Sequence, residues 1–353
     1  IGYSSGADLA ANLIYNKDMK EKFHIDTGII SSFISLGGTL DFSQCNSKEY
    51  KKYIKSPRVR EKILNALFFL PDSVMLKLQY RIKLKRRLNL KNPKRYTEKL
   101  QWYKMYYRNS LMHKCVDKYL VRDYVKKRGL ENILVDLYGK YNSIHEIDFK
   151  SLPECFVMKT THGGGGLNVV ICRDKKELDY DILSEKLSSG DKPFKKRSGG
   201  REWAYYGLKP GIIVEELLVN KNNPEAGIND YKFFCFDGKP EYIVADVDRY
   251  IGHKRNFYDV YWNNLHISSD CPVADREIDK PQKLQEMLKV ASRLSKGFPY
   301  VRVDLYEIEG QIYFGEMTFY PWSGYVQFMP DKFDFILGEK FKLPKSRKGK
   351  RIH

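Results

Sequence analysis

Apolar residues recur along this chain at two spacings, one typical of helices and the other typical of strands. Between residues 48 and 95 they follow one face of a helix, in two runs that Pro71 separates. The same spacing predicts four further helices, Ala7–Lys22, Thr97–Tyr107, Asp117–Gly129 and Pro281–Lys296. The aromatic side chains of the second of these could stack on sugar rings, but their helical spacing favours the core.

Strand-like apolar segments predominate after Gly129. Eight of them stand out: Ile133–Tyr138, Cys155–Thr160, Asn168–Arg173, Gly211–Leu218, Tyr231–Phe236, Glu241–Asp246, Tyr300–Ile308 and Gln311–Thr318. No internal repeat or long linker divides the chain. This alternation of strands and helices indicates an α+β or α/β fold.

The composition is that of a folded protein with a basic surface. With 353 residues, of which 42% are hydrophobic and 14% aromatic, the chain can bury a large core, so wholesale disorder is excluded. The formal net charge is +18, which points to an anionic partner. Two tracts without any acid carry much of this charge, Lys77–Arg95 with nine lysines and arginines and Phe341–His353 with six. We expect the second to be a mobile tail, and the first to be a solvated helix face or a surface for an anionic membrane or polymer.

The pattern contains no membrane span and no secretion signal. The most apolar stretch, Ile63–Leu70, is far shorter than the roughly 20 residues that cross a bilayer. We therefore expect a cytoplasmic protein. Six cysteines occur without a C-x-x-C pair, so neither a zinc site nor a disulfide framework is predicted, and Cys155 and Cys172 are expected in the core.

The segment most informative about chemistry joins a lysine to a run of glycines. An apolar strand carries Lys159 near its end, and Gly163–Gly166 follow within a few residues. Glycines allow a tight turn and bring backbone N–H groups close to an anion, so the segment predicts a phosphate-binding loop. It matches neither G-x-x-x-x-G-K-[ST] nor G-x-G-x-x-G. The alternative is a flexible hairpin tip.

Two acids toward the C-terminus are predicted to lie together on a hairpin. The last two predicted strands are joined by a tight turn at Glu309 and Gly310, and they carry Asp304 and Glu316. Carboxylates on one face can share divalent cations through their oxygens. The alternative is an ion pair between Asp304 and a lysine or arginine, because an unpaired buried carboxylate is costly.

The order of these features resembles the ATP-grasp superfamily, and specifically its TupA-like branch of teichuronopeptide biosynthesis. Along the chain, the lysine and glycine segment comes first, Glu215 and Glu216 follow, and Asp304 and then Glu316 come last. The resemblance covers about Asn92 to Pro344 and rests on six motifs in combination: Asp117-Lys118 with Arg122, Lys159 with Gly163–Gly166, Gly200-Arg201-Glu202-Trp203, Asp230-Tyr231-Lys232-Phe233-Phe234, Arg302-Val303-Asp304-Leu305-Tyr306, and Phe314-Gly315-Glu316-Met317-Thr318-Phe319.

The resemblance implies an α+β ATP-grasp fold, in which two subdomains grip ATP, and it implies roles for single residues. Lys118 and Lys159 would contact the phosphates, Glu215 would meet adenine, and Asp304 and Glu316 would bind Mg²⁺. The full set of expected nucleotide contacts is Lys118, Lys159, His162, Gly163, Gly164, Gly165, Gly166, Glu215, Glu216, Leu217 and Lys232. Thr318 is the third metal candidate. The superfamily usually has Asn at the position of Thr318, and more often Glu at the position of Asp304. Because of these two differences, we expect the site to hold either one or two ions. The catalytic candidates are Lys159, Arg249 and Arg302, with Lys254 and Arg255 as alternatives to Arg249 for contacting the γ-phosphate or a substrate carboxylate.

The resemblance also implies an ATP- and Mg²⁺-dependent carboxylate–amine ligase. A carboxylate would attack the γ-phosphate to give an acylphosphate and ADP, and an amine would then displace phosphate. The branch suggests capsule or cell-wall polysaccharide assembly, with a uronic acid or acidic peptide as carboxylate and an amino acid or amine as nucleophile. An anionic, lipid-linked saccharide at the inner face of the membrane would suit the basic tracts, and no specific nucleic acid is expected.

Five parts are expected along the chain: 1–45 of unknown role, 46–115 a basic helical region, 116–213 a subdomain with a glycine-rich lid, 214–340 a subdomain with the adenine hinge and metal acids, and 341–353 a basic tail. Two other functions are weighed. A glycosyltransferase using a nucleotide sugar would need a D-x-D motif, for which Asp246-Val247-Asp248 is the triplet considered. A non-catalytic basic adaptor would leave the glycine run and the acids unexplained.

Overall fold

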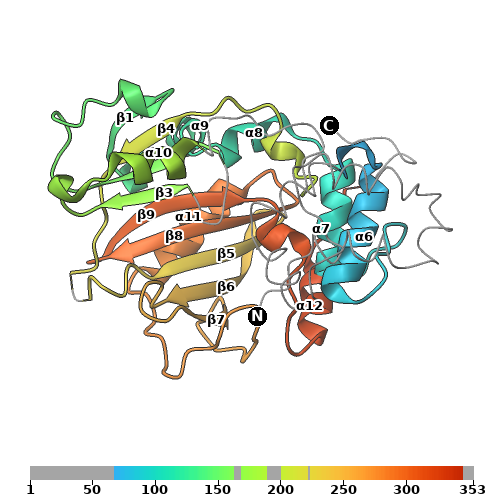
Figure 1. The fold of residues 1–353 in the computed structure, drawn as a ribbon. Coiled ribbons are helices and arrows are strands. Elements are labelled where there is room, and N and C mark those ends of the chain that lie inside the picture. Colours follow the sequence, from blue (N-terminus) through green and yellow to red (C-terminus); the bar gives the residue numbers. More distant parts are fainter. Residues whose placement is uncertain (1–66, 163–167, 189–199, 222, 345–353) are drawn as a thin grey trace, which may run out of the picture.

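Two antiparallel sheets with helices around them make up the fold (Figure 1). The computed structural model describes residues 67–162, 168–188, 200–221 and 223–344. The predicted helix Ala7–Lys22, the glycine run 163–166 and the tail from residue 345 lie outside these ranges. The helices are α6 (Asp72–Leu84), α7 (Tyr96–Tyr106), α8 (Ser110–Val116), α9 (Leu120–Lys127), α10 (Tyr180–Ser188), α11 (Leu284–Ser295) and α12 (Lys332–Lys340).

The strands divide into a smaller and a larger sheet, and the predicted α+β class is confirmed. The smaller sheet has the order β1-β4-β2-β3, with β1 (Leu137–Tyr141), β2 (Phe156–Thr160), β3 (Val169–Cys172) and β4 (Ile212–Glu215). The larger has the order β7-β6-β5-β8-β9, with β5 (Asp230–Phe236), β6 (Lys239–Val247), β7 (Lys254–Asp259), β8 (Tyr300–Ile308) and β9 (Gln311–Thr318). The expected subdomain boundary between residues 213 and 214 falls inside β4.

The smaller sheet has its own core. Leu183 and Leu187 of α10 pack against Phe156 and Met158 of β2 and Val214 of β4. These apolar side chains are nearly or fully buried. Helix α10 therefore covers one face of this sheet and holds β2, the strand of Lys159, in a rigid setting.

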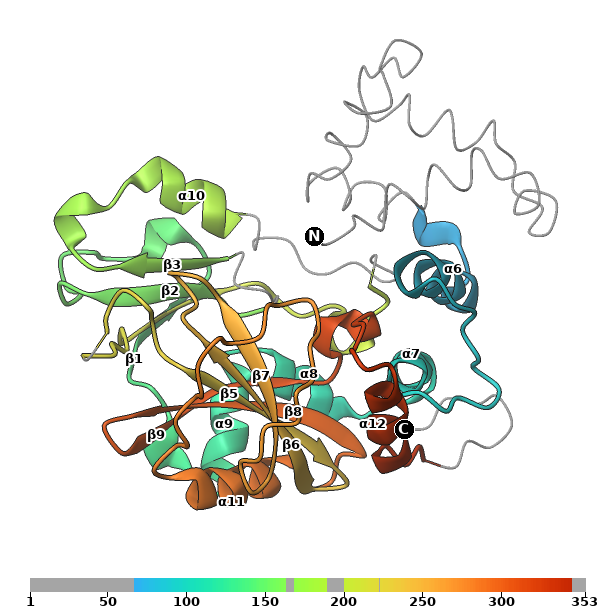
Figure 2. The same ribbon diagram turned by 90° about the horizontal axis from the view of Figure 1, so that it is seen from below.

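The two faces of the larger sheet differ in character because successive side chains of a strand point to opposite sides. On β5, Cys235 contacts the carbonyl of Ala291 in α11, so its odd-numbered residues face that helix. Figure 2 shows α8, α9 and α11 on this side. The even-numbered Phe234 and Phe236 instead pack against Tyr96 of α7, on the other face. The same face carries the charged side chains Asp230 and Lys232.

Helices α6, α7 and α12 gather at one end of the larger sheet (Figure 1). Helix α6 stops at Leu84, where Lys85 adopts a positive φ of 56°, so the predicted helical pattern up to Arg95 is wrong beyond this point. Glu98 accepts hydrogen bonds from the backbone of residues 94 and 95 and thereby caps α7. Gly338 of α12 lies so close to the 94–96 backbone that a Cβ there would be 2.1 Å from the carbonyl oxygen of Lys94. The close approach of Gly338 packs α12 tightly against the start of α7.

Several local predictions need correction. The strand expected at Ile133–Tyr138 begins instead at Leu137, β4 ends at Glu215 rather than Leu218, and β7, which carries Lys254 and Arg255, was not among the predicted strands. Phe341, the expected start of the tail, is fully buried. Cys172 is buried as predicted, but Cys155 is exposed. Tyr96 and Tyr103 of α7 are fully buried, so these aromatic residues belong to the core and not to a sugar-binding surface.

Candidate active site

Lys118 and Lys159 lie side by side at one edge of the smaller sheet. Lys159 comes from β2, and Lys118 from the turn that opens α9. Asp117 fixes that turn, because its Oδ1 accepts the backbone N–H groups of the next helix residues at 2.8 and 2.9 Å. The Lys118 N–H donates to the Thr161 carbonyl at 2.6 Å, which ties the turn to the end of β2. The backbone of Lys118 thus lies beside the end of β2, the strand that carries Lys159.

Glu215, at the end of β4, is shared by two cations. Its Oε2 accepts from Lys159 Nζ at 2.8 Å and its Oε1 from Arg122 Nη1 at 2.9 Å, while Arg122 also donates to the Val135 carbonyl. Glu215 is buried, whereas Glu216 and Leu217, just beyond the strand, are half-buried. The expected hinge carboxylate therefore points back to the lysine of β2.

Asp304 and Glu316 are direct cross-strand partners in the β8–β9 hairpin. The turn at Glu309 and Gly310 has two positive φ angles, as in a type I′ turn, and would by itself pair Glu316 with Val303. A bulge at Gly315 shifts the register by one residue and brings Glu316 opposite Asp304 instead. The bulge thereby places both carboxylates on the charged face of the larger sheet.

Arg302 connects these two acids. Its Nε and Nη2 donate to Asp304 Oδ1 and Oδ2 at 2.7 and 2.6 Å, and Nη2 also donates to Glu316 Oε1 at 3.0 Å and to Thr318 Oγ1 at 3.2 Å. Thr318 Oγ1 in turn donates to Glu316 Oε1 at 2.8 Å. The ion pair that was the alternative interpretation of this hairpin is therefore present, on the same carboxylates that were expected to bind metal.

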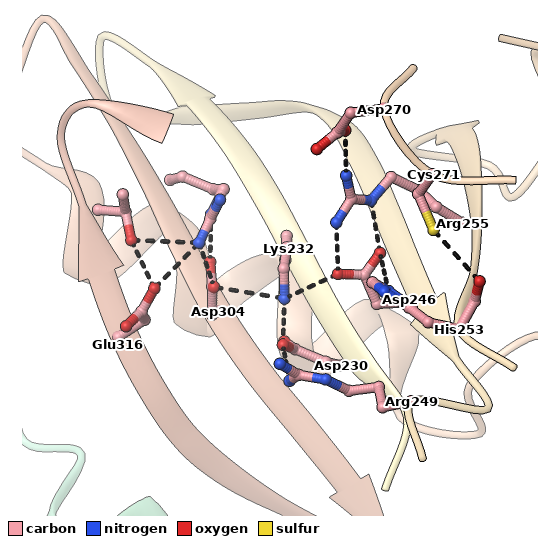
Figure 3. Close-up of polar contacts among 12 residues, drawn as sticks. Asp230, Lys232, Asp246, Arg249, His253, Arg255, Asp270, Cys271, Asp304 and Glu316 are labelled. Atoms are coloured by element: carbon pink, nitrogen blue, oxygen red, sulfur yellow. Dashed lines mark hydrogen bonds and ion pairs between the residues drawn. The ribbon is translucent and has the colours of Figure 1, made fainter. Parts of the chain in front are cut away.

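The charged cluster continues across the sheet, as Figure 3 shows. Lys232 forms ion pairs with Asp230, with Asp246 (3.4 Å) and with Asp304 (3.5 Å). Arg249 Nη1 donates to Asp230 Oδ2 at 2.9 Å at the more exposed end of the cluster. Acids and bases thus alternate from β9 through β8 and β5 to β6.

On β7, Arg255 closes the cluster. Its Nε and Nη2 donate to Asp246 Oδ1 and Oδ2 at 2.6 and 3.0 Å, and its Nη1 to Asp270 at 2.7 Å. His253 Nε2 lies 3.3 Å from Asp246. Lys254 pairs with the exposed Asp275 outside the cluster. Of the three residues considered for phosphate or substrate contact, Arg249 combines membership of the cluster with partial exposure.

Electrostatics links the two lysines to the two acids. Burial alone would raise the pKa of Glu316, but the charges of Arg302 and Lys118 outweigh burial and lower it to about 2. Burial and the charge of Lys159 lower the pKa of Lys118, while Glu316 opposes this shift. For Asp304, burial raises the pKa against the charges of Arg302 and Lys232. Lys118, beside the smaller sheet, is therefore within electrostatic reach of Glu316 on the larger one.

These side chains fit a magnesium ion that arrives with a nucleotide. Carboxylate and hydroxyl oxygens are ligands for Mg²⁺, and Asp304, Glu316 and Thr318 supply them from adjacent strands. Within the described ranges, His, Cys, Asp and Glu form no group of three that could hold a metal by itself. A pair of acids that relies on phosphate oxygens for further ligands is the usual arrangement for Mg²⁺.

The remaining predicted residues add little to the description of the site. His162 is buried, and its carbonyl accepts a hydrogen bond from Thr160. Gly163–Gly166 lie outside the described residues. The D-x-D triplet does not present two acids together, because Asp246 is engaged by Arg255 whereas Asp248 pairs with Arg276.

Sequence reasoning missed Asp230 and Asp246 as members of this cluster. Both are almost fully buried and both contact Lys232. The available signal was an acid at the edge of an otherwise apolar strand, in Asp230-Tyr231-Lys232 and again at the end of β6. A buried acid needs a charged partner, so such positions predict ion pairs.

The chain matches the family model for TupA-like ATP-grasp proteins over residues 98–342. Two curated D-alanine–D-alanine ligases of Helicobacter pylori, from strains HPAG1 and Shi470, are 22% and 23% identical to it over 209 and 211 residues. Each alignment covers 59% of this chain and 52% of the relative, so the chain spans about half the length of these relatives.

Solved structures of D-alanine–D-alanine ligases are also similar. That from Helicobacter pylori has a TM-score of 0.38 and 18% identity, and the match covers 66% of this chain and 60% of that one. That from Bacillus anthracis has a TM-score of 0.36 and 20% identity, with 58% and 57% covered. Over the described residues, no helix is both long and apolar enough to cross a membrane.

Proposed function

Because the chain belongs to the TupA-like ATP-grasp family, we propose that it uses ATP to join a carboxylate to an amine through an acylphosphate. Its α+β arrangement of two sheets is the ATP-grasp fold that the sequence predicts. The observation that carries the proposal is the direct cross-strand pairing of Asp304 with Glu316 on the larger sheet, and the effect of the Lys118 charge on the pKa of Glu316 supports a common site with the lysines. This site would combine lysines suited to phosphates with acids suited to a metal, between the two sheets.

Each group has a role that follows from its charge and setting. Lys118 and Lys159 neutralise the ATP phosphates, and Glu215 orients Lys159 through a 2.8 Å hydrogen bond. Asp304 and Glu316, with Thr318, hold Mg²⁺, which when bound spreads the negative charge that builds up on the transferring phosphoryl group. Arg249, half-exposed beside Asp230, binds the substrate carboxylate or the γ-phosphate.

The substrates follow from the chemistry of the family. The curated relatives are named as ligases that join two D-alanine molecules, which supports an amine as nucleophile and a carboxylate as the activated group. We propose an amino acid or amine as the first and a uronic acid or acidic peptide as the second, within an anionic glycan of the capsule or cell wall. The partly exposed guanidinium group of Arg249, at the open end of the charged cluster, supports an anionic substrate.

The basic ridge supports a second contact with that glycan. We define the basic ridge as Lys77, Arg81, Lys85, Arg87, Lys91 and Lys94. All six are exposed, and none forms an ion pair with a described residue. The apolar face of α6 is buried, with Met75 and Leu76 fully inaccessible, so this helix turns the charge of Lys77 and Arg81 to the solvent and keeps its apolar face in the core. This favours the anionic polymer over a membrane as its partner.

The activity is tested by incubating the protein with ATP, Mg²⁺, single amino acids and glucuronic-acid oligosaccharides. We expect ADP and phosphate to be released only when both a carboxylate and an amine are present. Replacing Lys159 with Met or Glu316 with Gln should lower turnover by at least about a hundredfold, since the first change removes a charge that neutralises the phosphates and the second removes a ligand of the metal ion.

Lys175→Met is a suitable control. Lys175 follows β3 of the smaller sheet and donates to the Leu152 carbonyl, away from the site. Full turnover by Lys159→Met would refute the residue assignment. A stronger thermal shift with UDP-glucose than with ATP would instead favour a glycosyltransferase.

A further inference from the structure

One atom of Arg302 contacts every residue expected to bind the metal. Nη2 lies 2.6 Å from Asp304 Oδ2, 3.0 Å from Glu316 Oε1 and 3.2 Å from Thr318 Oγ1. The second Asp304 oxygen is also taken, because Nε donates to it at 2.7 Å. The guanidinium group thus stands among the oxygen ligands where a divalent cation would be expected.

The charged face is already balanced without a metal ion. Its carboxylates are Glu316, Asp304, Asp230, Asp246 and Asp270, and its cations are Arg302, Lys232, Arg249, Arg255 and, through its effect on Glu316, Lys118. Each of these carboxylates therefore already has at least one cation as its ion-pair partner. A free divalent cation would bring two surplus positive charges into this buried cluster, whereas a nucleotide brings phosphate charges that offset them.

We infer that Arg302 occupies the metal position in the nucleotide-free protein and gives it up when phosphates arrive, so that metal binds only together with nucleotide. The inference rests on the proposed function, since it takes Asp304 and Glu316 as metal ligands. Arg302 then has a second partner to move to, because guanidinium binds phosphate oxygens in a bidentate manner. Arg302 is in this respect a positioning residue, and it makes metal binding conditional on nucleotide.

The test measures binding of Mn²⁺, a spectroscopic substitute for Mg²⁺, by electron paramagnetic resonance of the free ion. The wild-type protein should bind Mn²⁺ with the non-hydrolysable analogue AMP-PNP and should bind it weakly without the analogue. Arg302→Met removes the one cation that contacts both acids, and we expect it to bind Mn²⁺ alone at least about tenfold more tightly than the wild type. Adding Glu316→Gln to Arg302→Met should abolish this gain.

Arg255→Met is the matched control. Arg255 is likewise buried and makes the same two-pronged contact, with Asp246, but it does not touch the candidate metal ligands. It should lower stability in a similar way without creating a site for Mn²⁺. If the Arg302→Met protein does not fold, the double change Arg302→Met with Asp304→Asn keeps the cluster neutral and tests whether AMP-PNP is still needed for binding at Glu316.

The outcomes separate this inference from the proposed function. Binding of Mn²⁺ to the wild-type protein without nucleotide, lost in Glu316→Gln, would overturn the inference even if ATP turnover is normal. The inference is also overturned if Arg302→Met needs AMP-PNP as much as the wild type does. Failure of AMP-PNP to bind any of these proteins would count against the proposed function, while the nucleotide-free Mn²⁺ comparison would still decide the role of Arg302.

Discussion

At the scale of single residues, Glu215 joins α9 to the smaller sheet. Arg122 reaches it from α9 and Lys159 from β2, and each of these ion pairs is largely shielded from water. A shielded pair resists screening by salt better than an exposed one. The orientation of the Lys159 side chain therefore depends on a residue that was expected to meet adenine.

Replacing Glu215 with Gln should lower both stability and nucleotide affinity. The change removes the charge that holds two cations, and we expect a loss of about 1–3 kcal/mol in the free energy of unfolding. Urea unfolding and AMP-PNP titration measure the two effects. Glu154→Gln is the control, because Glu154 precedes β2 and forms an exposed ion pair with Lys175. It should alter neither stability nor nucleotide affinity. An equal effect of Glu154→Gln and Glu215→Gln would contradict this role for Glu215.

Lys104 is a buried lysine of a different kind. Its Nζ donates to the carbonyl and the hydroxyl of Ser323, each at 2.8 Å, and lies 3.8 Å from Glu202. Ser323 and its neighbour Trp322 both have positive φ angles, which are unfavourable for such residues. Lys104 thus stabilises a strained turn that directly follows the β8–β9 hairpin.

This lysine should make stability depend on alkaline pH. Burial lowers the pKa of Lys104 to about 8, although Glu202 opposes the shift. Between about pH 8 and pH 10 the unfolded chain binds a proton that the folded chain has lost, so the free energy of unfolding should rise with pH, by on the order of 1 kcal/mol per unit. Urea unfolding at several pH values should show that Lys104→Met weakens the rise. Parallel curves for the two proteins would contradict the assignment.

At this scale the sequence predicted residue types better than it predicted their partners. Asp304 and Glu316 stood out as acids among apolar neighbours, and Lys159 as a lysine before glycines. Their partners Arg302, Lys118 and Glu215 are fixed by register and helix packing, which depend on contacts between distant parts of the chain.

At the scale of elements, the bulge at Gly315 determines which side Glu316 faces. In a regular hairpin Glu316 would lie opposite Val303, on the face that packs against helices. Glycine fits because a Cβ at this position would lie 3.0 Å from the Asp304 carbonyl oxygen and 3.1 Å from the Tyr306 ring. A Cβ at position 315 would therefore press on the Asp304 backbone, and glycine avoids this contact.

Gly315→Ala should disturb the site more than it disturbs the fold. The added methyl group presses on the Asp304 backbone, so we expect a cost of about 1–3 kcal/mol and a loss of ATP-dependent turnover. Gly297→Ala is the control, since its positive φ of 95° also disfavours alanine but no atom lies within 4 Å. Calorimetry and phosphate release should show lower stability for both changes and lower turnover for Gly315→Ala alone. Normal turnover in Gly315→Ala would mean that the hairpin tolerates a Cβ here.

The strand that escaped prediction shows why pattern alone was insufficient. β7 begins Lys254-Arg255-Asn256 and so lacks alternating apolar residues, yet Arg255 and Asn256 are buried. Arg255 is buried because it pairs with Asp246 across the sheet. Strands with apolar alternation, such as β8 and β9, were located almost to the residue because water exclusion imposes that pattern on them.

For the whole molecule, the positive charge divides into paired and unpaired groups. Arg86 and Arg95 of the basic tract bind Asp331 and help to fasten α12, whereas the basic ridge faces solvent. Sequence alone could not separate the two groups, because Asp331 is more than two hundred residues away. The tract thus serves both the fold and, on our proposal, the polymer.

Reversing charge on the ridge should weaken binding to an anionic polysaccharide. We expect the triple change Lys77→Glu, Arg81→Glu and Lys85→Glu to lower affinity for hyaluronan at low salt by at least about tenfold and to flatten its salt dependence, since fewer counterions are released. The same reversal at the exposed Lys176, Lys280 and Lys289 should have little effect. Surface plasmon resonance at several salt concentrations measures the affinity of both triple variants for hyaluronan. An equal loss of affinity in the two variants would indicate that net charge alone, and not the basic ridge, determines binding.

The contact between α7 and α12 has a consequence for how this domain can be connected. α7 opens the region that matches the family and α12 closes it, and Gly338 brings their backbones together at one corner of the molecule. Neighbouring ends of this kind permit circular permutation and insertion into another chain. Further segments can therefore be joined at either end from the same corner without passing between the sheets, and they would emerge beside the basic ridge.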